Sequence, residues 1–160
     1  MPRVVRRRRL GAPPHEVWSV VSDPYHLPRW WPRTKRVENV TSGAPSGRKW
    51  TQVLETRDGR GIRADYRCIS AAAEERYVYE QLLEGTPFAG ILRSARTEVR
   101  LRPTEAGTEV SVASEQRLRG LSRLGGFMMR RAIGRTLSEA LSGLERATGG
   151  GSTDAQEASG

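Results

Sequence analysis

The stretch APPHEVW at residues 12–18, followed by SDPYHLPRWWP at residues 22–32, is the most informative part of this chain for its fold. Proline suits the first turn of a helix, where its missing N–H costs no hydrogen bond, so a helix is predicted over 13–22. The residue before a proline avoids helical angles, so Asp23-Pro24 should end that helix, and a second short helix should follow over 25–31. Three of the four tryptophans lie in this segment, which is too short to be a domain by itself. They must therefore pack against residues further along the chain.

Alternation of apolar and polar residues elsewhere in the chain predicts a sheet. Within residues 62–69, apolar or small side chains alternate with Arg63, Asp65 and Arg67, which is typical of a strand in a sheet with one wet face. The Asp58-Gly59 pair before this strand favours a hairpin turn. Seven strands are predicted, over residues 4–10, 36–40, 49–56, 62–69, 76–83, 91–101 and 108–118.

The last predicted element is a long helix over 120–147. Leu137, Leu141 and Leu144 form one apolar stripe at helical spacing, whereas Leu121, Leu124 and Met128 point nearly the opposite way. We expect a break or bend near Gly125-Gly126 to reconcile the two stripes. Residues 148–160 are rich in Gly, Ser and acidic residues and contain no large apolar side chain, so we expect a disordered tail after a single domain over 1–147.

Composition limits the class of protein. No apolar run is long enough to span a membrane, no apolar segment follows the basic start, and the single cysteine excludes an internal disulfide, which together favour a cytoplasmic protein. The net charge of +9 on 160 residues leaves transient contact with an anionic membrane surface open. Because the arginines are spread along the chain and mixed with acidic residues on the outward sheet face, we expect no specific nucleic-acid partner.

In this order, the elements resemble the START-like (SRPBCC) superfamily, in its polyketide cyclase/dehydrase and lipid-transport branch, over about residues 3–147. The matching residues are Leu10-Gly11-Ala12-Pro13-Pro14, Glu16-Val17-Trp18, Ser22-Asp23-Pro24, Leu27 to Pro32, and Gly107-Thr108-Glu109-Val110, together with the closing leucine helix. The resemblance implies an α+β helix-grip fold, in which a curved seven-stranded antiparallel sheet surrounds a long C-terminal helix and two short helices follow the first strand. It also implies an apolar cavity between sheet and helix that binds a lipid or polyketide-like molecule.

Strand and helix faces predict which residues would line that cavity. Ligand sites are mostly apolar with a few polar groups that orient the ligand. Ser114 and Gln116 are either ligand contacts or residues at a wet strand end, and Gly134 either permits close packing or leaves room for a ligand. Arg93 either anchors an acidic ligand or reaches out to solvent. The predicted ligand-cavity residues are Trp31, Tyr66, Arg93, Val99, Val112, Ser114, Gln116, Phe127, Gly134 and Leu137.

Catalytic motifs are weak in this sequence. His15 and His26 have no nucleophile or carboxylate at an informative spacing and make a poor metal site, and Cys68 is expected to be a buried small hydrophobe. We therefore expect no metal and no cofactor, and binding of a hydrophobic small molecule without chemistry is the leading interpretation. The alternative is a polyketide cyclase or dehydratase that acts on a ligand in the same cavity.

Overall fold

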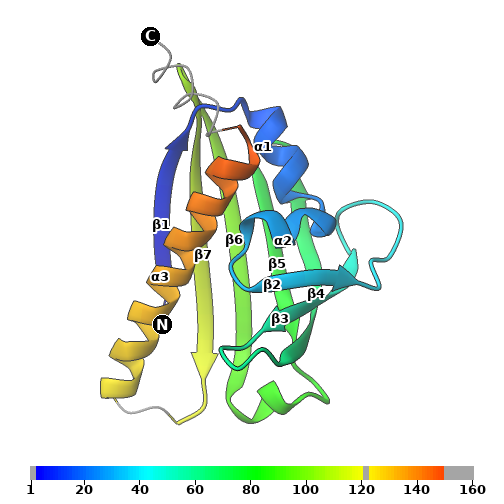
Figure 1. The fold of residues 1–160 in the computed structure, drawn as a ribbon, viewed down its shortest axis with the longest axis vertical. Helices are drawn as coiled ribbons and strands as arrows, with labels where there is room; N and C mark the ends of the chain where they lie inside the picture. Colours follow the sequence, from blue (N-terminus) through cyan, green and yellow to red (C-terminus); the bar gives the residue numbers. More distant parts are fainter. Residues whose placement is uncertain (1–2, 121–122, 150–160) are drawn as a thin grey trace.

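A seven-stranded antiparallel sheet curves around one long helix in the computed structural model of the chain, which describes residues 3–120 and 123–149 (Figure 1). The strands are β1 (Arg3–Leu10), β2 (Thr34–Glu38), β3 (Lys49–Glu55), β4 (Gly61–Ala72), β5 (Arg76–Leu82), β6 (Leu92–Thr104) and β7 (Gly107–Leu118). The helices are α1 (Pro14–Val21), α2 (Leu27–Trp30) and α3 (Arg123–Ala147), with short 3₁₀ turns η1 (Pro24–His26) and η2 (Pro87–Gly90). The predicted α+β helix-grip fold is confirmed.

Sequential hairpins build the sheet from β2 to β7, and β1 closes it at the β7 edge. The register of that last pairing runs from Arg3 opposite Glu115 to Leu10 opposite Thr108. Because β1 and β2 lie at opposite edges of the sheet, the chain between them must cross one end of it. The tryptophan-rich segment, as α1, η1 and α2, makes that crossing (Figure 1).

Local capping explains why this crossing breaks into short helices. Pro14 opens α1, and the Ser22 hydroxyl donates a 2.7 Å hydrogen bond to the Trp18 carbonyl at its end. The Asp23 carboxylate then accepts a 3.0 Å hydrogen bond from the Tyr25 backbone N–H and caps η1. The predicted second helix over 25–31 is thus a 3₁₀ turn followed by α2.

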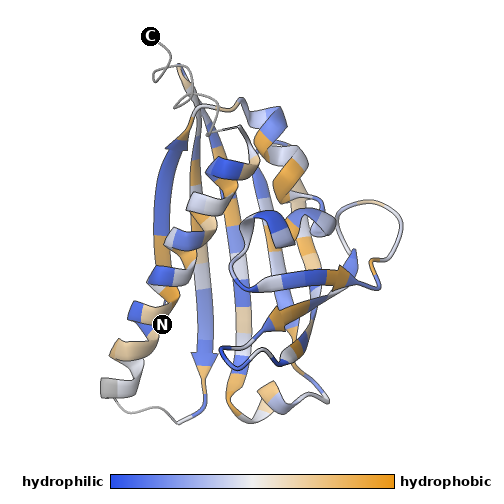
Figure 2. Cartoon of the chain, viewed as in Figure 1, coloured by the Kyte–Doolittle hydropathy of each residue, from blue (hydrophilic) through white to orange (hydrophobic). Residues whose placement is uncertain are grey.

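The core lies between the inner face of the sheet and α3. Apolar and polar positions alternate along the strands (Figure 2), and the apolar ones meet the buried leucine stripe Leu137, Leu141 and Leu144 of the helix. Full burial of such a side chain contributes about 1.5–3 kcal/mol. Gly143 permits α2 to touch α3, because a Cβ there would lie 2.8 Å from the Trp30 Cα. The stripe and this glycine together hold the helix within the sheet.

The outward face of the sheet carries ion pairs. Glu98 lies at its centre, where it accepts hydrogen bonds of 2.7 Å from Arg76 and 2.6 Å from Arg100. Burial by itself raises the pKa of Glu98, but the hydrogen bonds from Arg100 and Arg76 outweigh it and hold the pKa below its usual range.

Helix α3 is continuous from Arg123 to Ala147, so it does not break at Gly125-Gly126. Of the second predicted stripe, Met128 is 64% exposed, and Leu121 lies outside the described residues. At the other end, Thr148 is buried and its hydroxyl donates a 2.7 Å hydrogen bond to the Leu144 carbonyl. The rest of the predicted tail, residues 150–160, lies outside the described residues.

Candidate ligand-binding site

A pocket with a volume of about 270 Å³ lies between the inner face of the sheet and α3. This volume is close to the lower end of the range for small-molecule sites. The sheet side of the pocket, which we call the sheet wall, comprises Gln52, Tyr66, Tyr79, Gln81, Ala95, Arg96, Thr97, Ser114 and Gln116. Trp31, directly after α2, and five residues of α3 close the other side.

Aromatic rings form the floor of the sheet wall. Tyr66 on β4 stacks on Trp50 on β3 at 5.9 Å between ring centroids, because these two residues are direct partners in the strand register. Tyr79 meets Trp50 edge-on at 5.6 Å and meets Trp31 edge-on at 6.5 Å. Each ring is held by its neighbours in a favourable aromatic geometry, so the floor is a preformed apolar surface.

Both tyrosines of the floor are neutral phenols at physiological pH. Burial raises the pKa of Tyr66 to about 12. Burial raises the pKa of Tyr79 further, as does the nearby Tyr66, while a hydrogen bond with the Thr97 side chain acts in the opposite direction. The phenols can donate a hydrogen bond to a ligand oxygen, and they cannot act as bases near neutral pH.

The polar groups of the sheet wall divide into engaged and available ones. The Gln52 amide is engaged: its Nε2 donates to the Thr34 hydroxyl at 2.9 Å, and its Oε1 accepts from Trp50 Nε1 at 3.4 Å. By contrast, the side chains of Tyr66, Ser114 and Gln116 form no hydrogen bond with any described residue. Because all three line the pocket, their polar atoms are available to a ligand oxygen or to water.

The chemistry that these side chains can perform is restricted. Among the described residues that line the pocket, none is a carboxylate, an imidazole, a thiol or a primary amine. Cys68 is buried and does not line the pocket. In the part of the chain that the structure covers, no three acidic, histidine or cysteine side chains gather as a metal site would require. The arrangement can bind a molecule, orient it and polarise a carbonyl, but it holds no strong general base.

Five of the ten predicted cavity residues line this pocket, namely Trp31, Tyr66, Ser114, Gln116 and Leu137. Val99 and Val112 are paired with each other across β6 and β7 and are completely buried in the core beside it. Gly134 faces β1, where the guanidinium of Arg6 occupies the space that a side chain would need, so close packing explains this glycine.

Arg93 and Phe127 lie outside the pocket as well. Arg93 is exposed because an irregularity between Leu92 and Ser94 interrupts the alternation of β6 that predicted an inward side chain. Phe127 lies in the first turns of α3 with 64% of its surface exposed.

Ten of the pocket residues were not predicted from the sequence. They are Gln52, Tyr79, Gln81, Ala95, Arg96, Thr97, Met129, Ala132, Ile133 and Thr136. Strand alternation carried a signal for Tyr79, which pairs with the inward Cys68. Helical spacing counted back from Leu137 likewise reaches Ile133 and Met129.

Comparison with known families agrees with this architecture. The model of the family described as polyketide cyclase / dehydrase and lipid transport matches residues 1–149. The chain belongs to this family. A comparison of the chain with curated proteins found no match. No helix of its described residues is long and apolar enough to cross a membrane.

Solved structures of the same fold are distant in sequence from this polyketide cyclase/dehydrase and lipid-transport family member. A Chromobacterium violaceum protein has 20% identity and a TM-score of 0.70, with 92% of this chain and 98% of that chain covered. A Thermus thermophilus protein has 19% identity and a TM-score of 0.71, covering 92% and 97% of the two chains. The di-domain ARO/CYC StfQ from the steffimycin biosynthetic pathway has 16% identity and a TM-score of 0.71, covering 91% of this chain and 49% of StfQ.

Proposed function

We propose that this protein binds a hydrophobic small molecule, of lipid or polyketide type, in the pocket between the sheet and α3. The observation that supports this most directly is the combination of an aromatic floor with three unengaged polar groups, those of Tyr66, Ser114 and Gln116. A flat apolar ligand carrying a few carbonyl or hydroxyl oxygens matches that combination in shape and chemistry. The ligand-binding domain would be residues 1–147, acting in the cytoplasm without a metal or a nucleotide cofactor.

Binding without chemistry is favoured over catalysis because proton transfer needs a group that titrates near the working pH. Both phenols of the pocket have raised pKa values, and the remaining polar groups are amides, hydroxyls and the guanidinium of Arg96. Arginines on the outward sheet face are paired with glutamates, so this face is a solvated surface of mixed charge. It gives no support to a specific nucleic-acid partner.

A cyclase or dehydratase that acts in the same pocket is the second candidate. It draws on the similarity to StfQ and on the unengaged Tyr66 hydroxyl, which could polarise a ketone for ring closure. If this candidate is right, the protein turns over a poly-ketone substrate. The turnover rate should then fall at least tenfold in Tyr66→Phe. Turnover that is unchanged in this variant would remove Tyr66 from the mechanism.

The binding function is tested with phenylnaphthylamine, a neutral dye whose fluorescence rises in apolar surroundings. Ser114→Leu fills the pocket from β7 and should weaken dye binding more than tenfold. Ser111→Leu is the matched control, because Ser111 lies on the same strand with its side chain on the outward face, where it accepts a hydrogen bond from Arg7. Its dye affinity should stay within twofold of the unmodified protein.

Native mass spectrometry of the purified protein should in addition detect a co-purified hydrophobic compound, lost in Ser114→Leu. Dye that fails to bind the unmodified protein, or that binds both serine variants equally well, would contradict the proposed site.

A further inference from the structure

The sheet opens between β5 and β6 at the level of the pocket. Backbone pairing of these two strands stops at Glu80 opposite Arg96. On either side the pairing continues, with β6 joined to β7 as far as Leu92 opposite Leu118 and β4 joined to β5 as far as Asp65 opposite Leu82. The last residues of β5 and the first residues of β6 therefore separate, and we call this opening the β5–β6 gap.

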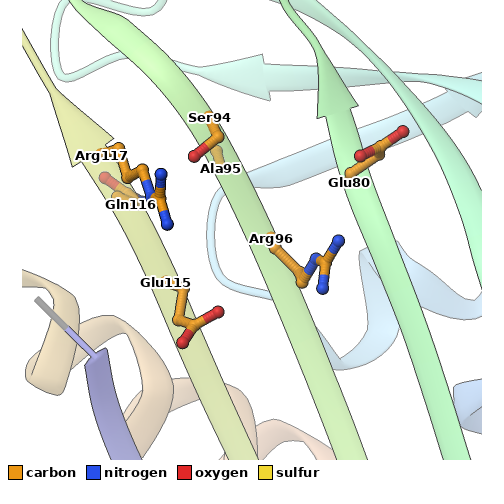
Figure 3. Close-up of a pocket in the computed structure, with 7 residues that line it drawn as sticks. All are labelled: Glu80, Ser94, Ala95, Arg96, Glu115, Gln116 and Arg117. Carbon is orange, nitrogen blue, oxygen red and sulfur yellow. The ribbon is translucent and has the colours of Figure 1, made fainter. Parts of the chain in front are cut away.

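A second pocket lies on the outward side of the β5–β6 gap, with a volume of about 330 Å³ (Figure 3). It is lined by Glu80, Ser94, Ala95, Arg96, Glu115, Gln116 and Arg117. Three of these residues, Ala95, Arg96 and Gln116, also line the inner pocket described above. The two pockets thus adjoin at the place where the sheet lacks backbone pairing.

The outer pocket holds two carboxylates and two guanidiniums, and Arg96 lies opposite both Glu80 and Glu115 in the strand register. Its two carboxylates already have partners outside its lining: Glu80 lies 2.6 Å from Arg67, and Glu115 lies 3.8 Å from Arg3. The two arginines of the lining, Arg96 and Arg117, form no ion pair or side-chain hydrogen bond with any residue that the structure describes. Their guanidinium groups are thus the donors in this pocket that remain open to an anionic group.

We propose that the ligand is an anionic amphiphile, with its apolar body in the inner pocket and its acidic end in the β5–β6 gap, bound by Arg96 and Arg117. The inner pocket offers only neutral partners apart from Arg96, so an acidic group would be poorly solvated there. In the outer pocket the same group meets solvent and two guanidiniums that are unpaired within the described residues, and the two carboxylates there are already paired with Arg67 and Arg3. The inference rests on the proposed function and adds the ligand's charge and the direction in which its acidic end points.

Two dyes with the same ring system test this charge preference. Anilinonaphthalene sulfonate carries a sulfonate that the neutral phenylnaphthylamine lacks. The unmodified protein should bind the anionic dye at least fivefold more tightly than the neutral one at low salt. This preference should shrink as salt rises, since exposed charges are screened.

Single arginine variants locate the acidic end. Arg96→Gln and Arg117→Gln should each weaken binding of the anionic dye by about fivefold to tenfold, as expected for loss of one charge-assisted hydrogen bond. Because Arg117 lines only the outer pocket, Arg117→Gln should leave binding of the neutral dye within twofold. Arg102→Gln is the matched control, because Arg102 lies on the outward face of β6 outside the pocket, 3.1 Å from Glu109. It should leave both dyes within twofold.

The outcomes separate this inference from the proposed function. Arg117 lines only the outer pocket. If Arg96→Gln weakens binding of the anionic dye and Arg117→Gln does not, the acidic end lies in the inner pocket, and its proposed position in the β5–β6 gap is overturned. Equal weakening of both dyes in Arg117→Gln would overturn the charge preference. If the neutral dye binds and the anionic dye has no advantage, only this inference fails. If neither dye binds the unmodified protein, the proposed function fails with it.

Discussion

The guanidinium of Arg8 donates a 2.7 Å hydrogen bond to the hydroxyl of Ser142, which joins the first strand to the last helix across 134 positions of the chain. The bond is partly buried, and it lies on the same side of β1 as the Arg6 guanidinium that covers Gly134. The arginines of β1 that point toward α3 therefore help to hold the helix against the sheet edge.

Ser142→Ala should lower the free energy of unfolding by about 1 kcal/mol, because it leaves a partly buried guanidinium without its acceptor. Urea denaturation followed by circular dichroism measures this change. Ser19→Ala is the control, since the Ser19 hydroxyl donates to the Glu16 carbonyl at an exposed site. Equal stability of Ser142→Ala and the unmodified protein would show that the bond contributes nothing to folding.

Gly143→Ala should destabilise the protein by about 1–3 kcal/mol, because the added methyl group would meet the backbone of Trp30, which cannot rotate away as a side chain can. Gly126→Ala, in the same helix, has open space around its Cβ and should instead stabilise by up to about 1 kcal/mol. Thermal melting of the two variants side by side gives the comparison. Shifts of the same sign would contradict the packing of α2 on α3.

Glu98→Gln should make stability less sensitive to acid. The pKa of Glu98 is lower in the folded protein than in the unfolded chain, so its charge stabilises the fold above about pH 4, the unfolded value, and this contribution disappears as pH falls through the folded pKa. The unmodified protein should therefore lose more stability than Glu98→Gln on acidification below about pH 5. Urea midpoints measured across this range test the difference.

Glu105→Gln is the control for that experiment, because Glu105 lies in the exposed turn between β6 and β7 and forms no ion pair within the described residues. A pH profile of Glu98→Gln that runs parallel to that of the unmodified protein would contradict a stabilising role for the Glu98 cluster.

Tyr66→Phe should weaken binding of Nile red, a neutral dye with a ring carbonyl, by about fivefold, since one neutral hydrogen bond contributes about 1 kcal/mol. The ring keeps its stacking on Trp50, so binding of phenylnaphthylamine should not change. Because the pKa of Tyr66 is raised to about 12, Nile red affinity should be constant between about pH 6 and pH 9. Both dyes weakening together would indicate that the substitution disturbs the pocket rather than one hydrogen bond.

Local patterns were sufficient for most of the fold. The proline and tryptophan segment predicted two short helices because capping and proline geometry act within a few residues, and α1, η1 and α2 follow it. Strand alternation assigned Tyr66, Ser114 and Gln116 to the face that lines the pocket. These features depend on neighbours in the chain, so they can be recognised without the rest of the molecule.

The sequence by itself therefore determined the order of the elements, the inward faces of most strands and the leucine stripe of α3. Three features were decided only by the tertiary structure. The alternation of β6 fails between Leu92 and Ser94, and the Arg6 guanidinium occupies the space beside Gly134. The pairing of β5 with β6 ends at Arg96. The physical reason is that a register shift, a close approach and a gap in a sheet each involve two segments that lie far apart in the chain. No pattern within one segment contains that information.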